Sequence, residues 1–308
     1  MKITFLSAFS PDGAARRLAR LGELFTGADA RDEFELPHAI PNGQQSLVGV
    51  NHSAKGSPAA CLQADSAACG INHAMTISII IPTLNEAALV TQAVAHAWET
   101  IPHEVLVADG GSKDGTSEAA RAAGAIVVET PRGRAWQQNT AARRATGDVL
   151  LFLHADTWLA TDGVRQIERA LADQSVECGA FRQRIDAEGR LYRWLERGNG
   201  WRAAHRGLPY GDQGIFVRRC VFEHLGGFPV LRLMEDLMLM KRLRRRGRPV
   251  LLPGPLHVSA RRWQRYGVVR QTARNWWLLS AARLGVHPDR LARYYPAHDK
   301  ARSERSAR

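Results

Sequence analysis

The chain has 308 residues, of which 45% are hydrophobic, and a formal net charge of +12. This composition is that of a globular protein with a sizeable core, and no run approaches the roughly 18 apolar residues that a membrane helix needs. The four cysteines form no CxxC pair, so the sequence indicates neither a zinc site nor a disulfide framework. The start, MKITFLSAFS, resembles a signal peptide only weakly, and we expect a cytoplasmic protein.

The positive charge is concentrated at the C-terminal end. From Lys241 to Arg308 there are 18 Lys and Arg residues against three acidic ones, so the rest of the chain is slightly acidic. A basic region of this kind fits a polyanionic neighbour such as phosphates, nucleic acid or an anionic membrane surface. It fits solvated arginines in an Arg-rich composition equally well. Charge alone leaves the partner open.

Residues 1–74 differ from the rest of the chain. Small and polar residues dominate, the turn signals PDG, PNG and KGSP recur, and hydrophobic periodicity fades after Phe25. We expect an N-terminal extension that is disordered or non-native and adds nothing to the fold. Met75, directly before the first convincing strand, is then an alternative start.

From Thr76 onward, predicted strands alternate with predicted helices. Helices are expected over about four turns after PTLNE, over Ser117–Ala123, and up to Ala145. The strands are expected at Ile77–Ile81, Glu104–Ala108, Ala125–Glu129 and Val149–Leu153. Because this alternation produces βαβ units, the pattern predicts an α/β fold with a parallel sheet.

Polar clusters follow three of these strands. The first is Thr83-Leu84-Asn85-Glu86, the second Asp109-Gly110-Gly111-Ser112, and the third His154-Ala155-Asp156. In open parallel sheets ligands bind beyond the carboxyl ends of the strands, so the three clusters predict one site.

The absence of two motifs limits the classes of ligand that the predicted site can bind. There is no GxGxxG dinucleotide fingerprint after the first strand and no GxxxxGK[ST] phosphate loop. The carboxylates point instead to a nucleotide whose phosphates are reached through a divalent metal, with Asp156 as a ligand. Asp109 is placed to accept a hydrogen bond from a base N–H.

The segments SIIIPTLNE, ADGGSKDGT, FLHADT and MEDLMLMKRL, in this order, resemble family 2 glycosyltransferases of the GT-A fold. The resemblance runs from about Thr76 to Tyr295. YGDQGIF, GGFP and ARRW are similar to the branch associated with radical-SAM and selenodomain proteins. The resemblance implies one GT-A catalytic domain at residues 75–295, with a Rossmann-like, mostly parallel sheet flanked by helices, and a basic disordered tail at residues 296–308.

The resemblance also implies an activity, namely inverting transfer of a sugar from a nucleotide-diphosphosugar, with a UDP-sugar favoured, to an acceptor hydroxyl. Asp236 of the pair Glu235-Asp236 would be the catalytic base, and Asp156 the metal carboxylate. The residues implied in donor binding are Pro82, Thr83, Asn85, Glu86, Asp109, Gly110, Arg134 and Asp156.

One position departs from the family's pattern. The metal motif of the family is usually Asp-x-Asp, and here its first position is His154. An imidazole can bind Mn²⁺ but suits Mg²⁺ poorly, so the divalent metal, Mn²⁺ or Mg²⁺, is left open. His257 is either a hydrogen-bonded polar residue or a further metal ligand.

The second half of the chain is expected to bind the acceptor and the diphosphate. A strand is predicted at Val176–Ile185, a helix at Leu191–Arg206, and a second strand at Ile215–Arg218. Asp236 opens a predicted helix to Arg246, so helix capping is the alternative to its role as base. Guanidinium groups match phosphate oxygens, and an indole can stack on an acceptor. The acceptor and diphosphate residues are therefore expected to be Asp212, Gln213, Glu235, Arg261, Arg262 and Trp263.

The segment Val268–Leu284 is amphipathic. One side of the helical wheel carries Val269, Ala273, Trp276, Trp277 and Leu284, and the other carries Arg270, Gln271, Arg274 and Asn275. We expect the apolar side to pack on the catalytic domain; shallow insertion into a membrane is the alternative.

Other functions remain to be distinguished. A peripheral-membrane glycosyltransferase at the inner face of the membrane would act on a lipid or a carotenoid acid. A non-catalytic binder of nucleic acid or another polyanion would use the basic tail. We favour the enzyme, with a small molecule or a lipid as acceptor and no nucleic acid as partner.

Overall fold

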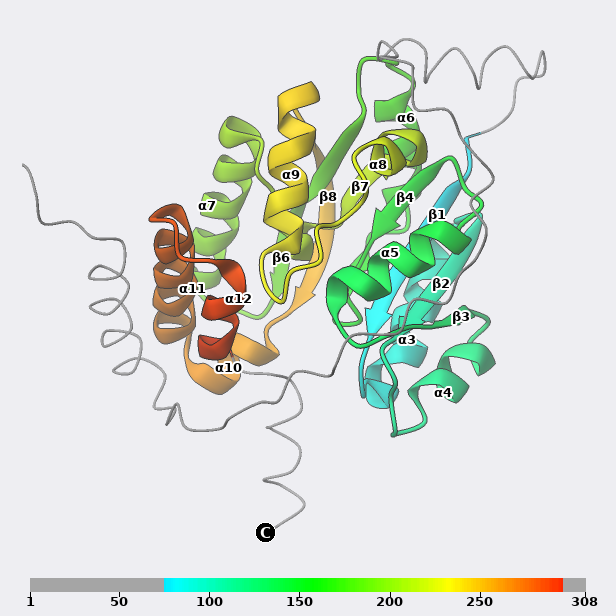
Figure 1. The fold of residues 1–308 in the computed structure, drawn as a ribbon, viewed down its shortest axis with the longest axis horizontal. Helices are drawn as coiled ribbons and strands as arrows, with labels where there is room; N and C mark the ends of the chain where they lie inside the picture. Colours follow the sequence, from blue (N-terminus) through cyan, green and yellow to red (C-terminus); the bar gives the residue numbers. More distant parts are fainter. Residues whose placement is uncertain (1–74, 296–308) are drawn as a thin grey trace, which may run out of the picture.

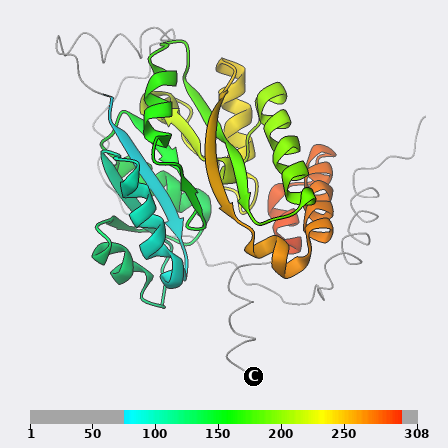
Figure 2. The same cartoon turned by 180° about the vertical axis from the view of Figure 1, so that it is seen from behind.

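The computed structural model describes residues 75–295. The predictions for residues 1–74 and 296–308 lie outside this range. Within it, eight strands form one mixed sheet in the order β3-β2-β1-β4-β7-β6-β8-β5, with helices on both faces (Figures 1 and 2). Across residues 75–295, none of the helices combines the length and the apolar character needed to cross a membrane.

The first half of the domain is built of β-α units. Its elements are β1 (Ile77–Thr83), α3 (Ala87–Glu99), β2 (Glu104–Asp109), α4 (Thr116–Ala122), β3 (Ile126–Glu129), α5 (Arg134–Arg144), β4 (Val149–Phe152), β5 (Thr157–Leu159) and α6 (Gly163–Leu171). Strands β3, β2, β1 and β4 are parallel, as the alternating pattern predicts.

The second half continues the same sheet. Its elements are β6 (Cys178–Asp186), α7 (Arg190–Arg206), η1 (Gly211–Gln213), β7 (Ile215–Arg218), α8 (Arg219–His224), α9 (Glu235–Arg246), β8 (Val250–Ser259), α10 (Arg261–Tyr266), α11 (Val268–Arg283), α12 (Pro288–Leu291) and η2 (Ala292–Tyr294). Strand β7 runs antiparallel to β4 and β6, β6 pairs with β8 in parallel, and β5 lies antiparallel to β8 at the edge.

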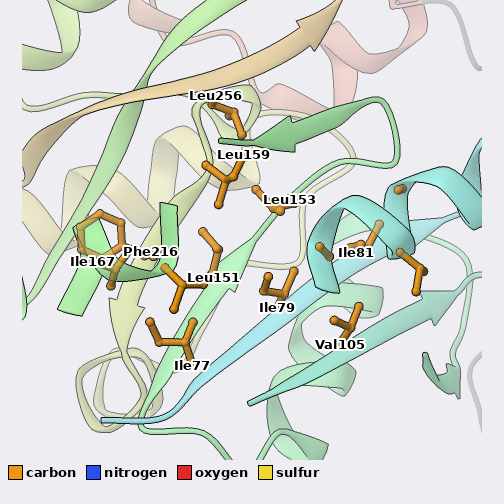
Figure 3. Packing of buried hydrophobic residues seen from close by; sticks show 14 of the residues in the cluster. Ile77, Ile79, Ile81, Val105, Leu151, Leu153, Leu159, Ile167, Phe216 and Leu256 are labelled. Carbon is orange, nitrogen blue, oxygen red and sulfur yellow. The ribbon is translucent and has the colours of Figure 1, made fainter. Parts of the chain in front are cut away.

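The core lies on both faces of the sheet. Ile77, Ile79 and Ile81 of β1 pack toward α3, α4 and α6, as Figure 3 shows for their side of the sheet. Ile80 points to the other face, where α5, α8 and α9 cover it. Because both faces are covered, the central strands are continuous apolar runs, which is typical of parallel sheets. Burial of this surface is the main stabilising contribution to the domain.

A buried carboxylate joins three strands at the amino-terminal edge of the sheet. Glu104 on β2 accepts hydrogen bonds from the Ser78 hydroxyl (2.6 Å) and from the Thr146 backbone N–H (2.6 Å). Burial favours the neutral acid, but these hydrogen bonds outweigh it and hold the pKa of Glu104 below its ordinary value. The ion therefore contributes to stability at neutral pH.

Two local features differ from what the sequence indicated. Helix α9 begins at Glu235 and its N-cap is Met234, which has φ 65°, so Asp236 lies in the first turn and is not the cap. Strand β8 was not predicted, because Pro253, Gly254 and Pro255 interrupt an otherwise apolar segment.

The orientation of α11 also differs from the expectation. Its polar residues Gln271 and Arg274 are buried, together with Leu278. The guanidinium of Arg274 lies over the rings of Tyr266 and Tyr295, at 5.3 and 5.6 Å from their centroids. The side that was expected to pack on the domain is largely exposed, and of its aromatic residues only Trp277 packs inward.

Candidate active site

The carboxyl ends of β1 and β2 lie side by side, as predicted. Thr83 at the end of β1 is in register with Asp109 at the end of β2, and both side chains are buried. The Gly110 N–H donates to the Thr83 carbonyl at 3.0 Å, which continues the parallel ladder beyond the two strands. Pro82, one residue before Thr83, is in register with Ala108.

The loops after these strands are tied to each other. Asn85 has φ 54°; its N–H donates to the Ser112 hydroxyl and its Oδ1 accepts from the Lys113 N–H, both at 2.9 Å. The Ser112 N–H and hydroxyl donate to the two carboxylate oxygens of Asp109. The Glu86 N–H donates to Thr116 Oγ1 at 2.9 Å. The polar clusters that follow β1 and β2 are therefore joined by hydrogen bonds into one wall.

Gln137 on α5 supports this wall, although the sequence did not indicate this role. Its buried amide nitrogen donates to the Thr83 carbonyl at 2.6 Å and to the Ala108 carbonyl at 2.9 Å. A β-carbon at Gly110 would lie 3.0 Å from that amide nitrogen, so the backbone at Gly110 packs directly on it. A polar residue within a helix gives no sequence signal for such a contact.

The end of β4 brings His154 and Asp156 to the same edge. The Leu153 N–H donates to the Ile80 carbonyl at 3.0 Å, which sets β4 beside β1 up to its last residue. The Asp156 carboxylate is reached by the exposed guanidinium of Arg261, at 3.4 Å. The predicted convergence of the third cluster with the first is confirmed.

A pocket opens next to His154 and Asp156. Seven segments supply its walls: the start of α5, the β4–β5 loop, η1, the start of α9 with the residues before it, the β8–α10 junction, α11, and the residue after η2. The lining side chains are Arg134, His154, Asp156, Tyr210, Asp212, Leu233, Met234, Asp236, Leu237, Val258, Ser259, Arg262, Trp263, Gln271, Asn275, Leu278, Leu279 and Tyr295. Of the predicted acceptor and diphosphate residues, Asp212, Arg262 and Trp263 line the pocket.

Asp236 is fixed in the pocket wall by two backbone donors. Its Oδ2 accepts from the Gly211 N–H at 2.5 Å and its Oδ1 from the Leu237 N–H at 2.7 Å. A β-carbon at Gly211 would lie 3.0 Å from Asp236 Oδ2 and 3.3 Å from His154 Nε2. Asp236 and His154 thus border the same backbone position, where only a glycine leaves both side chains undisturbed.

Glu235 and Arg134 form an ion pair beside Asp236. The Arg134 Nε lies 3.4 Å from Glu235 Oε1, and the Glu235 side chain is only 2% exposed. The pKa of Arg134 is raised chiefly by Glu235, with smaller contributions from Asp236 and Asp156. Burial raises the pKa of Glu235, and Arg134 opposes that shift. The pair holds the Arg134 guanidinium in the pocket that Asp156 and Asp236 also line.

Asp212 and Gln213 have different surroundings. Gln213 is a structural residue, because its Oε1 accepts from Arg202 (2.8 Å) and from the Tyr210 N–H (3.1 Å). Asp212 Oδ1 is buried and has no hydrogen-bond partner among residues 75–295. Burial raises the pKa of Asp212, and Arg202 partly offsets this. An unsatisfied carboxyl oxygen in a pocket is suited to a ligand that carries a hydroxyl group.

The residues available for a divalent metal are Asp156 and His154. Burial, and next the charge of Arg134, lower the pKa of His154 to about 4, so its imidazole is neutral and can donate a lone pair. In the described part of the chain, no three His, Cys, Asp or Glu side chains are grouped so that they could hold a metal. Two protein ligands fit a metal that is completed by substrate phosphates.

His257 does not belong to this site. Its ring stacks on Trp158, at 5.3 Å between centroids and 5° between planes, and the pocket is lined by its neighbour Val258 instead. Side chains alternate along β8, so His257 faces the side of the sheet where His96 also stacks on Trp158. His257 as a metal ligand is therefore wrong.

Comparisons with known proteins agree with this geometry. The sequence model described as "Glycosyl transferase family 2" matches residues 78–226. The chain is 38% identical over 90 residues to an uncharacterized glycosyltransferase, YfnE, of Bacillus subtilis, covering 27% of this chain and 23% of YfnE. It is 34% identical over 91 residues to glycosyltransferase AglE of Haloferax volcanii, covering 26% of this chain and 30% of AglE.

These two matches span less than a third of either relative. A solved structure is similar over a longer range: the mannosyltransferase PcManGT from Pyrobaculum calidifontis, in complex with GDP-Man and Mn²⁺. It has a TM-score of 0.51 and 23% identity, with 77% of this chain and 75% of that chain covered. This likeness shows the GT-A fold. Residues 78–226, which include the motif loops at the ends of β1, β2 and β4, therefore form a domain of the glycosyl transferase family 2 type.

Proposed function

We propose that this protein is an inverting glycosyltransferase that moves a sugar from a nucleotide-diphosphosugar to an acceptor hydroxyl. The observation that carries the proposal is the position of Asp236, held by two backbone N–H groups in a pocket that it shares with Asp156. A base and a carboxylate that can hold a metal for the donor diphosphate, placed in one pocket, suit a single displacement.

The donor would lie along the wall formed by the loops after β1 and β2, with its diphosphate toward Asp156. Thr83, Asn85, Glu86, Asp109 and Gly110 would hold the nucleoside. The donor nucleotide is open to test: PcManGT is solved with GDP-Man, and a UDP-sugar remains the first candidate.

In the reaction, Asp236 takes the proton of the acceptor hydroxyl as that oxygen attacks the anomeric carbon. The new C–O bond forms while the bond between the anomeric carbon and the diphosphate oxygen breaks, and the nucleoside diphosphate leaves. Attack from the opposite side inverts the anomeric configuration. Arg134 and Arg262, which both line the pocket, would offset the negative charge that develops on the leaving group.

A divalent metal fits beside these residues. Asp156 and the neutral imidazole of His154 would hold it, and it would supply a Lewis acid that neutralises the departing diphosphate. Arg261 lies against Asp156 through a largely exposed side chain, so it can move away when another cation takes its place. A carboxylate with an imidazole favours Mn²⁺ over Mg²⁺.

The acceptor is proposed to be an amphiphile, because charged and apolar side chains line the same pocket. The charged side chains include Asp212, Asp236 and Arg262. The apolar side chains come from the loop before α9, from α9 itself, from α10 and from α11; they are Leu233, Met234, Leu237, Trp263, Leu278 and Leu279. An acceptor with a hydroxyl-bearing head and an apolar body would bury both parts.

Thermal-shift measurements with UDP-, GDP- and dTDP-sugars, with and without Mn²⁺, test the proposal. A ligand that binds only the folded state raises its melting temperature, so we expect one nucleotide class to stabilise the chain in the presence of metal. Asp156→Ala should remove the metal-dependent part of this shift. If no sugar nucleotide stabilises the protein at millimolar concentration, the proposed donor is wrong.

A further inference from the structure

The outward side of α11 carries large apolar side chains, although two polar residues of this helix, Gln271 and Arg274, point inward. Val269 is 71% exposed and Trp276 is 58% exposed, and Leu284, directly after the helix, is 67% exposed. On the opposite side Gln271 is 3% exposed. Large apolar side chains that gather at one place on a surface indicate an interaction site, whereas single exposed ones need no explanation.

Helix α7 carries a second set of such side chains. Leu191, Trp194 and Trp201 are exposed and lie within about 80° of one another on the helical wheel. Of the eleven large hydrophobic side chains that are exposed within residues 75–295, six belong to α7, to α11 or to the residue after α11. Both views of the fold show α7 next to α11, at the end of the molecule away from α3, α4 and α5 (Figures 1 and 2).

The charges among these side chains have one sign. Arg190 and Arg197 are exposed on the same side of α7 as its tryptophans, and Arg283 is exposed at the end of α11. The one acidic residue of α7, Glu196, lies on the other side of the helix and pairs with Arg193 at 2.9 Å. Helix α11 contains no acidic residue. The docking surface is thus defined by Trp194, Trp201, Val269, Trp276 and Leu284 with Arg190, Arg197 and Arg283.

We propose that this docking surface binds an anionic phospholipid bilayer. Indole rings prefer the boundary between headgroups and acyl chains, because they combine a large apolar body with one polar N–H. Arginines beside them reach the lipid phosphates through long side chains. The arginines could also bind the phosphates of a nucleic acid. A nucleic acid would leave Val269 and Leu284 exposed to water, however, so it fits this surface less well than a bilayer does.

The docking surface and the pocket share one helix. Gln271, Asn275 and Leu279 of α11 line the pocket, whereas Val269 and Trp276 of the same helix lie on the docking surface. Docking would therefore hold the pocket beside the bilayer, where an amphiphilic acceptor is concentrated. This consequence rests on the proposed transfer reaction, but the binding of the bilayer does not.

Sedimentation of the full chain with vesicles tests the inference. We expect binding to phosphatidylcholine vesicles that contain about 30% phosphatidylglycerol, little binding to pure phosphatidylcholine, and weaker binding at high salt. Trp276→Ser with Leu284→Ser should reduce the partition coefficient at least about tenfold. Arg197→Gln with Arg283→Gln should reduce it about thirtyfold, from about 1 kcal/mol for each arginine.

Matched variants at the other end of the molecule are the controls. Ile101→Ser with Trp136→Ser removes similarly exposed apolar side chains, and Arg143→Gln with Arg144→Gln removes two exposed charges on α5. Both controls should bind vesicles as the wild type does, and far-ultraviolet circular dichroism checks that all variants are folded.

Three results would overturn the inference. The first is an absence of wild-type binding to anionic vesicles at low salt, which would also follow if another segment of the chain covered the surface. The second is equal binding by the docking-surface variants and the wild type. The third is self-association in sedimentation velocity that Trp276→Ser abolishes, because the surface would then join two copies of the chain. None of these results depends on sugar transfer.

Discussion

Replacing Asp236 by Asn separates the chemistry from donor binding. The amide cannot take a proton at neutral pH, so the rate of transfer should fall by about 10²–10⁴, equivalent to about 3–5 kcal/mol of lost transition-state stabilisation. Donor binding should stay nearly intact, because the proposed donor wall lies at the ends of β1 and β2. The rate of nucleoside diphosphate release and the calorimetric Kd of the donor measure the two effects separately.

The substitution also has a structural cost that the experiment must separate from the chemical one. Asp236 accepts two backbone hydrogen bonds, and an amide has only one oxygen, so one of them is lost. The loss of a hydrogen bond to a charged group costs about 2 kcal/mol, which lowers the Tm of a domain of this size by about 4–8 °C. Glu177→Gln is the matched control: Glu177 Oε1 and Oε2 accept from Arg246 Nη2 (2.8 Å) and Nε (2.9 Å), and Glu177 does not line the pocket.

We expect Glu177→Gln to lower the Tm but to leave turnover unchanged, whereas Asp236→Asn affects both. Near-normal turnover by Asp236→Asn would refute the assignment of Asp236 as base. A weakened donor Kd with unchanged turnover at saturation would instead make it a donor-binding residue.

Three further predictions follow from the same geometry. Because the folded-state pKa of Glu104 is lowered, the contribution of Glu104 to stability is complete above about pH 4.5 and is lost as the pH falls through the folded-state pKa. Glu104→Gln should lower the unfolding free energy by about 2 kcal/mol at pH 7. In urea titrations the unfolding free energy of this variant should depend less on pH in the acid range than that of the wild type. Gln137→Leu removes two hydrogen bonds to backbone carbonyls, of which the Thr83 carbonyl keeps the bond from the Gly110 N–H, and it should cost about 1–3 kcal/mol. It should also raise the donor Kd several-fold in calorimetry, and an unchanged Kd would mean that the wall does not hold the donor. In titrations of donor binding with metal, Asp156→Ala should abolish the effect of the metal on the donor Kd, and His154→Ala should weaken that effect. His154→Asp should shift the preference from Mn²⁺ to Mg²⁺. If His154→Ala abolished the effect of the metal, the imidazole would be the main metal ligand.

The parallel half of the fold could be predicted from the sequence for a physical reason. Strands buried on both faces are continuous apolar runs, and the polar residues that follow them must meet at one edge of the sheet. Thr83 and Asp109 therefore lie in register at the ends of β1 and β2, and β4, which precedes His154 and Asp156, lies beside β1. The base candidate Asp236 was expected from the family resemblance, and its pocket brings it to the same edge.

The parts that were not predicted depend on contacts between distant segments. Gln137 supports a carbonyl 54 residues away, and nothing in its local sequence indicates that contact. Strand β8 contains two prolines, which local rules exclude from a central strand, but it forms long ladders with β6 and β5. The wheel pattern of α11 placed Gln271 and Arg274 opposite Trp276, as observed, but the buried side is the one with Gln271 and Arg274. The reason is that Arg274 packs on the rings of Tyr266 and Tyr295.

The configuration of the released sugar tests the central claim most directly. Whichever α-linked sugar nucleotide stabilises the protein in the thermal-shift screen can be followed by proton nuclear magnetic resonance, with water or an added alcohol as acceptor. A single displacement assisted by Asp236 predicts that the first product formed, before mutarotation, is the β anomer, and that Asp236→Asn slows its appearance by about 10²–10⁴. An α anomer as first product, or an unchanged rate in the variant, would contradict the account.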